Sequence, residues 1–196
     1  KKIFLIVCSI KRSNIIFKNP PRRNIVIFDV INKSELKNIL QGKKAFFLSD
    51  FNRVKNIEKI YISIPVLKET IRQIFKGNFK ICYYVAIINI VKPKTLLTFI
   101  DNNFTFYKIS KFYKNKIKCI AIQNAWRDLN EFKKKQIREI YLDQFICYGP
   151  QTKSHYLSKG ASVSKFHFFG SLRQSNAEKY FNRKKIKFHK KKYDLC

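Results

Sequence analysis

Three clusters of polar side chains follow apolar segments in the second half of this 196-residue chain. The first is Asp101-Asn102-Asn103, directly after the apolar run that ends at Ile100. A carboxylate at this position can orient a substrate hydroxyl or accept its proton, while the two amides bind further hydroxyls. Asp101 or Asn102 can instead cap a following helix, because a side-chain oxygen satisfies the free N–H groups of its first turn. The sequence is compatible with both roles.

The second cluster combines amide, indole and guanidinium groups within five residues: Gln123, Asn124, Trp126 and Arg127. Amides supply the paired donors and acceptors that suit sugar hydroxyls, an aromatic face stacks on a sugar ring, and an arginine clamps a phosphate or carboxylate. A structural role is the alternative. In that case Trp126 fills a gap in the core, and Arg127 pairs with Asp128 or Glu131.

The third cluster consists of two glycine turns, Tyr148-Gly149-Pro150 and Gly170-Ser171-Leu172-Arg173. Each glycine stands where a strand is expected to pass into a helix, and the missing Cβ permits positive φ or the close approach of a ligand. Neither turn has the spacing of a dinucleotide or P-loop fingerprint. The turns are therefore candidates for substrate binding, with a purely structural turn as the alternative.

The sequence offers no metal site, triad or redox motif. His155, His167 and His189 lack ligand spacing, and no serine stands in a nucleophile elbow. The cysteines lie far apart and mostly in apolar runs: Cys8, Cys82, Cys119, Cys147 and Cys196. Because no two of them have the spacing of a zinc or redox pair, we expect buried reduced thiols in a cytoplasmic protein. We expect neither a metal nor a resident cofactor.

Short β-rich runs alternate with amphipathic stretches along the chain, which predicts an α/β fold: a Rossmann-like, open, mostly parallel sheet flanked by helices. The expected strands are 3–7, 24–28, 45–48, 59–64, 95–100, 117–122, 144–148 and 165–169. The expected helices are 33–40, 66–75, 79–91, 103–113, 130–141 and 150–158. Ligands of such sheets bind beyond the carboxyl ends of the strands. We therefore expect Asp101 and residues 123–127 to leave neighbouring strands on one rim and to converge.

The charge is strongly positive, with 42 Lys and Arg against 12 Asp and Glu and a net charge of +30. Only nine of the basic residues are Arg, and the excess Lys accompanies many Ile, Asn, Phe and Tyr residues, which is typical of an AT-rich genome. The alternatives are attraction to anionic lipid head groups or sugar phosphates, and dedicated nucleic-acid binding. Apolar runs are all shorter than the roughly 18 residues that a membrane-spanning helix needs.

The composition changes near Tyr180, where a dense basic run over 183–192 begins to dominate. A solvated linker and a membrane-facing patch both fit this run. We predict one Rossmann-like domain over 1–181, followed over 182–196 by a basic linker and the start of a second domain. The chain contains no Met and stops where a strand pattern begins, so we expect a piece of a longer protein.

Four stretches of the chain resemble a known family in their order and spacing: Lys92–Asn103, Phe106–Lys111, Ile120–Asn124 and Phe169–Arg173. Over these roughly 80 residues the chain is similar to bacterial surface carbohydrate (polysaccharide) biosynthesis proteins, which are glycosyltransferases of the GT-B type. The chain departs from the family at Ala125, where a glycine usually follows the Gln-Asn pair. We therefore expect a less open turn there.

The resemblance implies that residues 1–181 are the acceptor-side half of a GT-B enzyme, inactive alone, whose second domain begins near Tyr193 and holds most of the nucleotide-sugar donor. The complete enzyme would transfer a sugar to a surface polysaccharide or a lipid-linked glycan precursor, in the cytoplasm or peripherally at the anionic inner face of the plasma membrane. Asp101 would be the catalytic base or orienter. The alternatives are a glycerophosphate- or sialyl-type transferase of capsule or teichoic-acid assembly and a nucleic-acid-binding module, which the scattered lysines disfavour.

Overall fold

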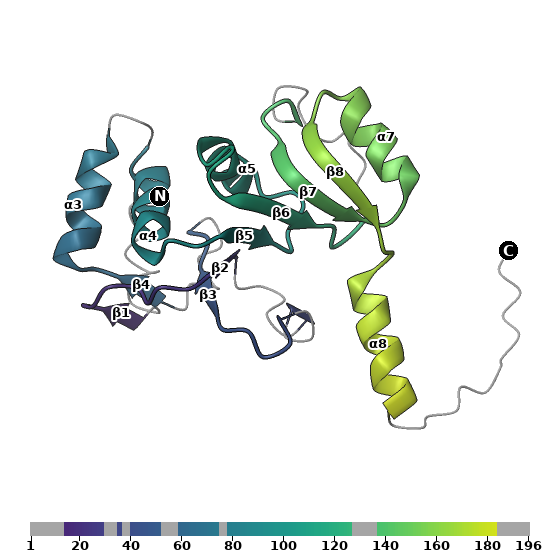
Figure 1. Cartoon of the computed structure of the whole chain (residues 1–196), viewed down its shortest axis with the longest axis horizontal. Coiled ribbons are helices and arrows are strands. Elements are labelled where there is room, and N and C mark those ends of the chain that lie inside the picture. Colours follow the sequence, from purple (N-terminus) through teal and green to yellow (C-terminus); the bar gives the residue numbers. More distant parts are fainter. Residues whose placement is uncertain are drawn as a thin grey trace, which may run out of the picture.

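A central sheet of six parallel strands organises the part of the chain that the computed structural model describes, residues 14–29, 35–36, 40–51, 59–74, 78–126 and 137–183. Its strands, in their order across the sheet, are β3 (Ala45–Leu48), β2 (Ile25–Phe28), β5 (Thr95–Thr98), β6 (Lys118–Ile122), β7 (Tyr141–Cys147) and β8 (Ser162–Phe168). Every neighbouring pair is parallel. The predicted Rossmann-like α/β fold is confirmed (Figure 1).

The strand order reverses direction between β2 and β5. From β2 the chain first adds β3 on one side, then returns to place β5 on the other side and continues outward through β6, β7 and β8. The registers place Phe28 opposite both Leu48 and Thr98. Open α/β sheets bind ligands at such a switch point, beyond the carboxyl ends of the strands.

A second, two-stranded parallel sheet lies beside the main one. It pairs β1 (Asn14–Ile16) with β4 (Lys59–Tyr61) and leads into the helical hairpin of α3 (Ile64–Arg72) and α4 (Phe79–Val91). The sequence did not predict β1, and the predicted strand over 3–7 lies outside the described residues. The predicted strand over 59–64 is too long, because Ser63 accepts a hydrogen bond from the Val66 amide and caps a helix that already begins at Ile64.

The larger core fills one face of the sheet. Alternate strand residues such as Val26, Leu96 and Ala121 point to this face and pack beneath α4 and α5 (Phe104–Phe112). Farther along, Phe145 contacts Tyr156 of α7 (Pro150–Ser158), with ring centroids 4.9 Å apart. Because α4 lies between the sheet and α3, it is apolar nearly all round and lacks an amphipathic period.

The opposite face of the sheet has a smaller core. Ile27, Leu97, Phe99 and Ile122 point to this face and pack with Leu36, and Leu172 of α8 (Leu172–Arg183) lies against them. The sequence did not predict α8, which is mostly polar and has few residues to mark an apolar stripe. Tyr180, near the predicted domain boundary, lies within this helix. The division of the chain at 181/182 stays a prediction.

Helix α4 has the predicted bounds because strong local signals mark both ends. The Asn78 side chain accepts a hydrogen bond from the Ile81 amide at 3.0 Å, which caps the first turn. At the other end Lys92 takes a left-handed conformation, and Pro93 cannot continue the helix. Strand β3 and helix α7 also have their predicted bounds.

The predicted helix over 130–141 is wrong at its end. Residues 130–136 lie outside the described part of the chain, and Tyr141 already begins β7, three residues before the predicted strand. The reason is a tertiary contact: the Asp143 carboxylate accepts a hydrogen bond from the Cys119 amide of β6 at 2.7 Å. Aspartate is normally unfavourable in a strand, but this hydrogen bond satisfies its carboxylate inside β7. Strand β8 likewise begins earlier than predicted, at Ser162.

The described cysteines are buried free thiols, as predicted: Cys82, Cys119 and Cys147. Burial raises the pKa of Cys119 to about 11. Within the described residues, every helix is too short or too polar to cross a membrane. The other two cysteines and most of the predicted helix over 33–40 fall outside the described residues.

Candidate functional site

The carboxyl rim, defined here as residues 29, 49–50, 99–103, 123–126, 148–149 and 169–171, brings the three predicted clusters to one edge of the sheet. Among the described residues, three adjacent strands each lead into a buried aspartate on this rim: Asp29 after β2, Asp50 after β3 and Asp101 after β5. Asp29 has a left-handed φ of 78° and donates its amide to Leu48 O at 2.8 Å. The switch point is therefore rich in buried carboxylates.

Asp101 and Asn124 come together as the sequence predicts. The Asn124 amide donates to Oδ1 of Asp101 at 3.4 Å, which joins the loop after β5 to the loop after β6. From the other side, the Tyr107 hydroxyl donates to the Asp101 backbone carbonyl at 2.6 Å. Asp101 is only 1% exposed, so in this conformation it holds two loops together rather than facing solvent.

Gln123 links the second cluster to the turn at Gly149. Its Oε1 accepts hydrogen bonds from the Tyr148 amide at 3.0 Å and from the Thr152 hydroxyl at 3.3 Å. Its Nε2 donates to the carbonyl of Ala125 at 3.0 Å. With these bonds and 2% exposure, Gln123 fixes the loops after β6 and β7 and presents no free group to a ligand.

Asn103 caps α5 and at the same time contacts a carboxylate that the sequence analysis missed. Its Oδ1 accepts the Phe106 amide at 3.1 Å, and its Nδ2 donates to Oδ2 of Asp50 at 2.9 Å. The residue that caps this helix is therefore Asn103, and not Asp101 or Asn102 as the capping alternative predicted. Asp50 lies two residues after the end of β3, much as Asp101 lies three residues after the end of β5, and that position was the signal that could have identified it.

Asp50 is surrounded by polar partners in a buried setting. Lys80 lies 3.5 Å from Oδ1, and the Tyr84 hydroxyl donates to the same oxygen at 3.2 Å while accepting the Phe51 amide at 2.7 Å. Burial lowers the pKa of Lys80, and the Asp50 charge only partly opposes that shift. Burial, together with the nearby Asp50 charge, raises the pKa of Tyr84 well above its ordinary value. The tyrosine therefore stays protonated and keeps donating to the carboxylate.

The solvent-facing part of the rim is formed by other residues of the predicted clusters. Asn102 and Asn124 are half-buried, and Trp126 is 58% exposed. The alternative in which Trp126 fills a core gap is therefore wrong. Arg127 lies outside the described residues. An exposed indole on the same rim as two side-chain amides provides a stacking face and hydrogen-bonding groups for a hydroxyl-rich ligand.

The two glycine turns differ in their backbone. Gly170 has a φ of +70°, which favours glycine, whereas Gly149 is extended with a φ of −176° and caps α7 without a side-chain hydrogen bond. Gly149 therefore does not use positive φ, and the close approach of a ligand to it stays a prediction. Ser171 accepts the Gln174 amide at 3.4 Å and is half-buried.

Arg173 of α8 reaches back toward the end of β5. Its guanidinium lies over the Phe99 ring, 5.8 Å from the centroid, and its Nε lies 3.7 Å from a Glu35 carboxylate oxygen. The third predicted cluster thus approaches the first on the second face of the sheet. Arg173 is exposed, so the pair with Glu35 contributes little to stability but fixes where the positive charge lies.

The rim carries hydrogen-bonding groups and an aromatic face, and its described residues include no cluster of three or more His, Cys, Asp or Glu side chains that could hold a metal. No protein-family model, no curated protein and no solved structure matches the chain. The fold class rests on the strand order and the parallel pairing.

Proposed function

We propose that the complete protein is a glycosyltransferase that moves a sugar from a nucleotide-sugar donor to a surface polysaccharide or a lipid-linked glycan precursor. The observation that carries this proposal is the bond between the Asn124 amide and Asp101, because it joins the two polar loops at one rim beside the switch point. The resemblance of the stretches Lys92–Asn103 and Ile120–Asn124 to GT-B enzymes supports the same assignment.

The acceptor would bind over the solvent-facing part of the rim. Asn102 and Asn124 would bind sugar hydroxyls, and the exposed Trp126 ring would stack against a sugar face. The exposed Arg173 guanidinium, which also pairs with Glu35, would donate hydrogen bonds near Phe99 to an anionic group of the acceptor. The bound acceptor glycan would be bordered, at the outer strands of the sheet, by Gly149, Gly170 and Ser171.

Asp101 is the proposed base or acceptor-orienting group. Its carboxylate holds the Asn124 amide and is closed to solvent. An acceptor hydroxyl would therefore reach it only after the loop that begins at Gln123 moves aside. Opening this loop would also break the Gln123 bonds to Tyr148 and Thr152, so acceptor binding and loop movement would be coupled.

The nucleotide-sugar donor would bind mainly to a second domain, and we propose a reaction without a bound metal or resident cofactor. Helix dipoles and basic side chains can offset the charge of a leaving diphosphate. We further propose that the enzyme works on the cytoplasmic side, in peripheral contact with an anionic membrane surface, where lysine-rich segments are attracted.

A donor panel on the full-length protein tests the reaction class. Transfer from one or more nucleotide sugars supports the proposal. Turnover of CDP-glycerol with no nucleotide sugar would overturn it in favour of a glycerophosphate transferase, and turnover of CMP-sialic acid alone would narrow it to a sialyl-type transferase.

The role of Asp101 has its own test. We expect Asp101→Asn to reduce kcat by at least about tenfold, the low end of the loss for an acid–base group, while the fold stays intact by circular dichroism. Glu178→Gln removes an exposed carboxylate on α8 and serves as the charge control, with near-normal turnover. Normal turnover of Asp101→Asn would leave Asp101 as a structural link only.

A further inference from the structure

A strongly basic cavity lies at the opposite edge of the sheet from the carboxyl rim. Among the described residues, five cationic side chains line this space of about 560 Å³, with Ile25 and Val91 as its main apolar lining: Arg22, Arg23, Lys43, Lys44 and Lys92. The volume is that of a small-molecule site. Its lining carries five cationic residues beside its apolar surface, which sets it apart from an ordinary hydrophobic pocket.

The backbone brings these cations together from three segments. Arg22 and Arg23 precede β2, Lys43 and Lys44 precede β3, and Lys92 ends α4 just before β5. Because β3, β2 and β5 are neighbours in the sheet, their amino ends meet at one edge. Backbone hydrogen bonds connect the segment before β2 to the segment between α4 and β5. The Arg23 amide donates to Val91 O at 3.4 Å, and the Lys94 amide donates to Asn24 O at 2.9 Å.

The positive charges of this cavity have no carboxylate counter-ion among the described residues. None of the five cations forms an ion pair with a carboxylate in the part of the chain that the structure describes; the ion pairs there belong to Arg72, Lys80 and Arg173. The carbonyl end of α4 points to this edge, but a helix dipole offsets only about half an elementary charge. Most of the positive charge therefore remains available to an anion.

The chemistry of the lining defines the class of ligand. Guanidinium groups bind phosphate oxygens in pairs, and lysines act as point charges for phosphate. One negative charge would leave several cations repelling one another, whereas closely spaced phosphates would satisfy more of them. We propose that this cavity binds a ligand with two or more adjacent phosphate groups, whether carried by a soluble molecule or by a lipid head group. The site is separate from the proposed acceptor rim and does not depend on it.

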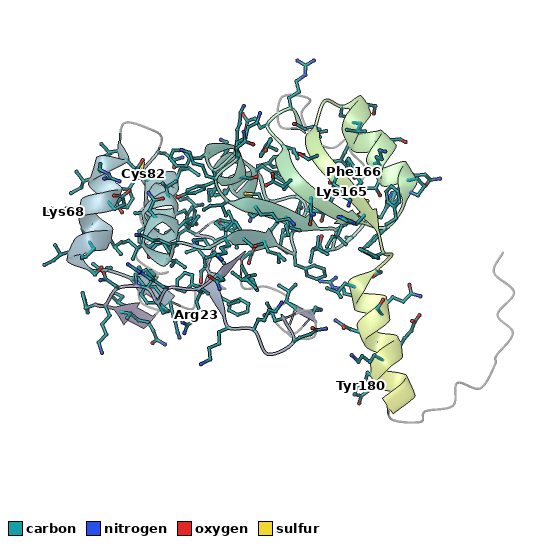
Figure 2. The ribbon with its side chains drawn as sticks, viewed as in Figure 1. Arg23, Lys68, Cys82, Lys165, Phe166 and Tyr180 are labelled. Carbon is teal, nitrogen blue, oxygen red and sulfur yellow. The ribbon has the colours of Figure 1, made fainter. Side chains whose placement is uncertain are left out.

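Three substitutions on the cavity and three elsewhere provide a charge-matched test. The cavity variant carries Arg22→Gln, Lys43→Gln and Lys44→Gln, and the control carries Lys108→Gln, Lys153→Gln and Lys165→Gln; all six side chains are exposed, so both variants are expected to fold. Figure 2 shows Arg23 of the cavity near β2 and Lys165 far away on β8. The probes are inorganic pyrophosphate, measured by calorimetry, and phosphatidylcholine vesicles with or without phosphatidylinositol bisphosphate, measured by co-sedimentation.

We expect the cavity variant to lose about tenfold in affinity for the probe that binds, and the control to lose less than about twofold. Pyrophosphate binding identifies a soluble source of the phosphates, whereas binding only to bisphosphate vesicles identifies a lipid source. Equal losses in both variants would overturn the proposal, because they indicate general charge attraction. Binding of neither probe, or tighter binding of duplex DNA that both variants weaken equally, would overturn it as well.

Lysine acetylation of the unaltered chain gives a second readout that needs no variant. We expect saturating probe to slow the modification of Lys43, Lys44 and Lys92 at least about threefold, while Lys108, Lys153 and Lys165 react as before. Mass spectrometry of the digested chain measures each site. Uniform protection of both sets, or protection of neither, would contradict a localised site.

Discussion

Asn103 donates a hydrogen bond from Nδ2 to Oδ2 of Asp50 at 2.9 Å, across 53 positions of the sequence. This contact ties the start of α5 to the end of β3, on either side of the switch point. The Lys80 ammonium and the Tyr84 hydroxyl reach the other carboxylate oxygen. Asp50 thus adds side-chain contacts between the two sides of the switch point, where β2 and β5 also pair through their backbones.

We predict that Asp50→Asn lowers the free energy of unfolding by about 1–3 kcal/mol, because a buried network loses its charged acceptor and Lys80 loses its counter-ion. Urea denaturation measures the change, with the exposed Glu178→Gln as a control within about 0.5 kcal/mol of the original chain. Adding Lys80→Met should recover part of the loss. Equal stability of Asp50→Asn and the control would show that the network contributes nothing.

Gln123 should be important for stability even though its position at a strand end suggests substrate binding. Gln123→Ala removes the acceptor of the Tyr148 amide and the Thr152 hydroxyl, so we expect a loss of about 1–3 kcal/mol. Gln151→Ala, on the exposed side of α7, is the matched control with a change below about 0.5 kcal/mol. Thermal or urea unfolding measures the loss of stability in each variant. Similar losses in Gln123→Ala and Gln151→Ala would contradict a stabilising role for the Gln123 hydrogen bonds.

Two carboxylates each accept a hydrogen bond from the backbone amide of a distant residue, and amide hydrogen exchange can compare these two bonds. Asp101 accepts the Asn124 amide and Asp143 accepts the Cys119 amide. We expect Asp101→Asn to speed exchange at Asn124 by about tenfold and to leave Cys119 unchanged, while Asp143→Asn does the reverse. Nuclear magnetic resonance resolves both amides. Parallel acceleration at both sites in either variant would indicate global destabilisation instead of a local link.

The same substitution should have opposite effects at the two glycine turns. At Gly170 the left-handed backbone penalises any side chain, so Gly170→Ser should cost about 1 kcal/mol. At Gly149 the backbone is extended and a Cβ would have open space, so Gly149→Ser can add the missing cap of α7 and gain a few tenths of a kcal/mol. The shift of the thermal unfolding midpoint shows whether each substitution stabilises or destabilises the fold. A loss at Gly149 would contradict the extended backbone.

Buried tyrosines should make the fold sensitive to alkali. Burial raises the pKa of Tyr83 to about 12 and also raises the pKa of Tyr84 and of Tyr113. A folded-state pKa above the unfolded value near 10 means that the unfolded chain releases these protons first. Their contribution to stability is therefore present below about pH 10 and is lost as pH rises toward 12.

Phenolate absorbance during an alkaline titration measures this effect. We expect Tyr83, Tyr84 and Tyr113 to ionise only together with unfolding, which circular dichroism reports. A Tyr113→Phe variant should remove one tyrosine from the late step. Ionisation of all ten tyrosines in a single early step, with the fold intact, would contradict the burial of these phenols.

The sequence determined the elements whose local signals agree with their surroundings. Local signals mark the observed bounds of β3, α4 and α7, because they depend on nearby residues only. Polar residues flank the apolar run of β3, the Asn78 cap and Pro93 bound the apolar helix α4, and Pro150 stands in the first turn of α7. Polar residues directly after strands also placed Asp101 and Asn124 on one rim. In a parallel sheet all carboxyl ends share an edge, so this part of the site follows from the strand assignment alone.

Only the tertiary structure decided which polar side chains of the rim face solvent and which are buried and form hydrogen bonds between its loops. Gln123 and Asp101 turn inward because partners from distant segments, such as Tyr148 and Asn124, satisfy them there. Asp143 could enter a strand because β6 supplied the Cys119 amide. The basic cavity likewise exists because the strand order makes β3, β2 and β5 neighbours. Burial and pairing depend on contacts between remote residues, which no local pattern contains.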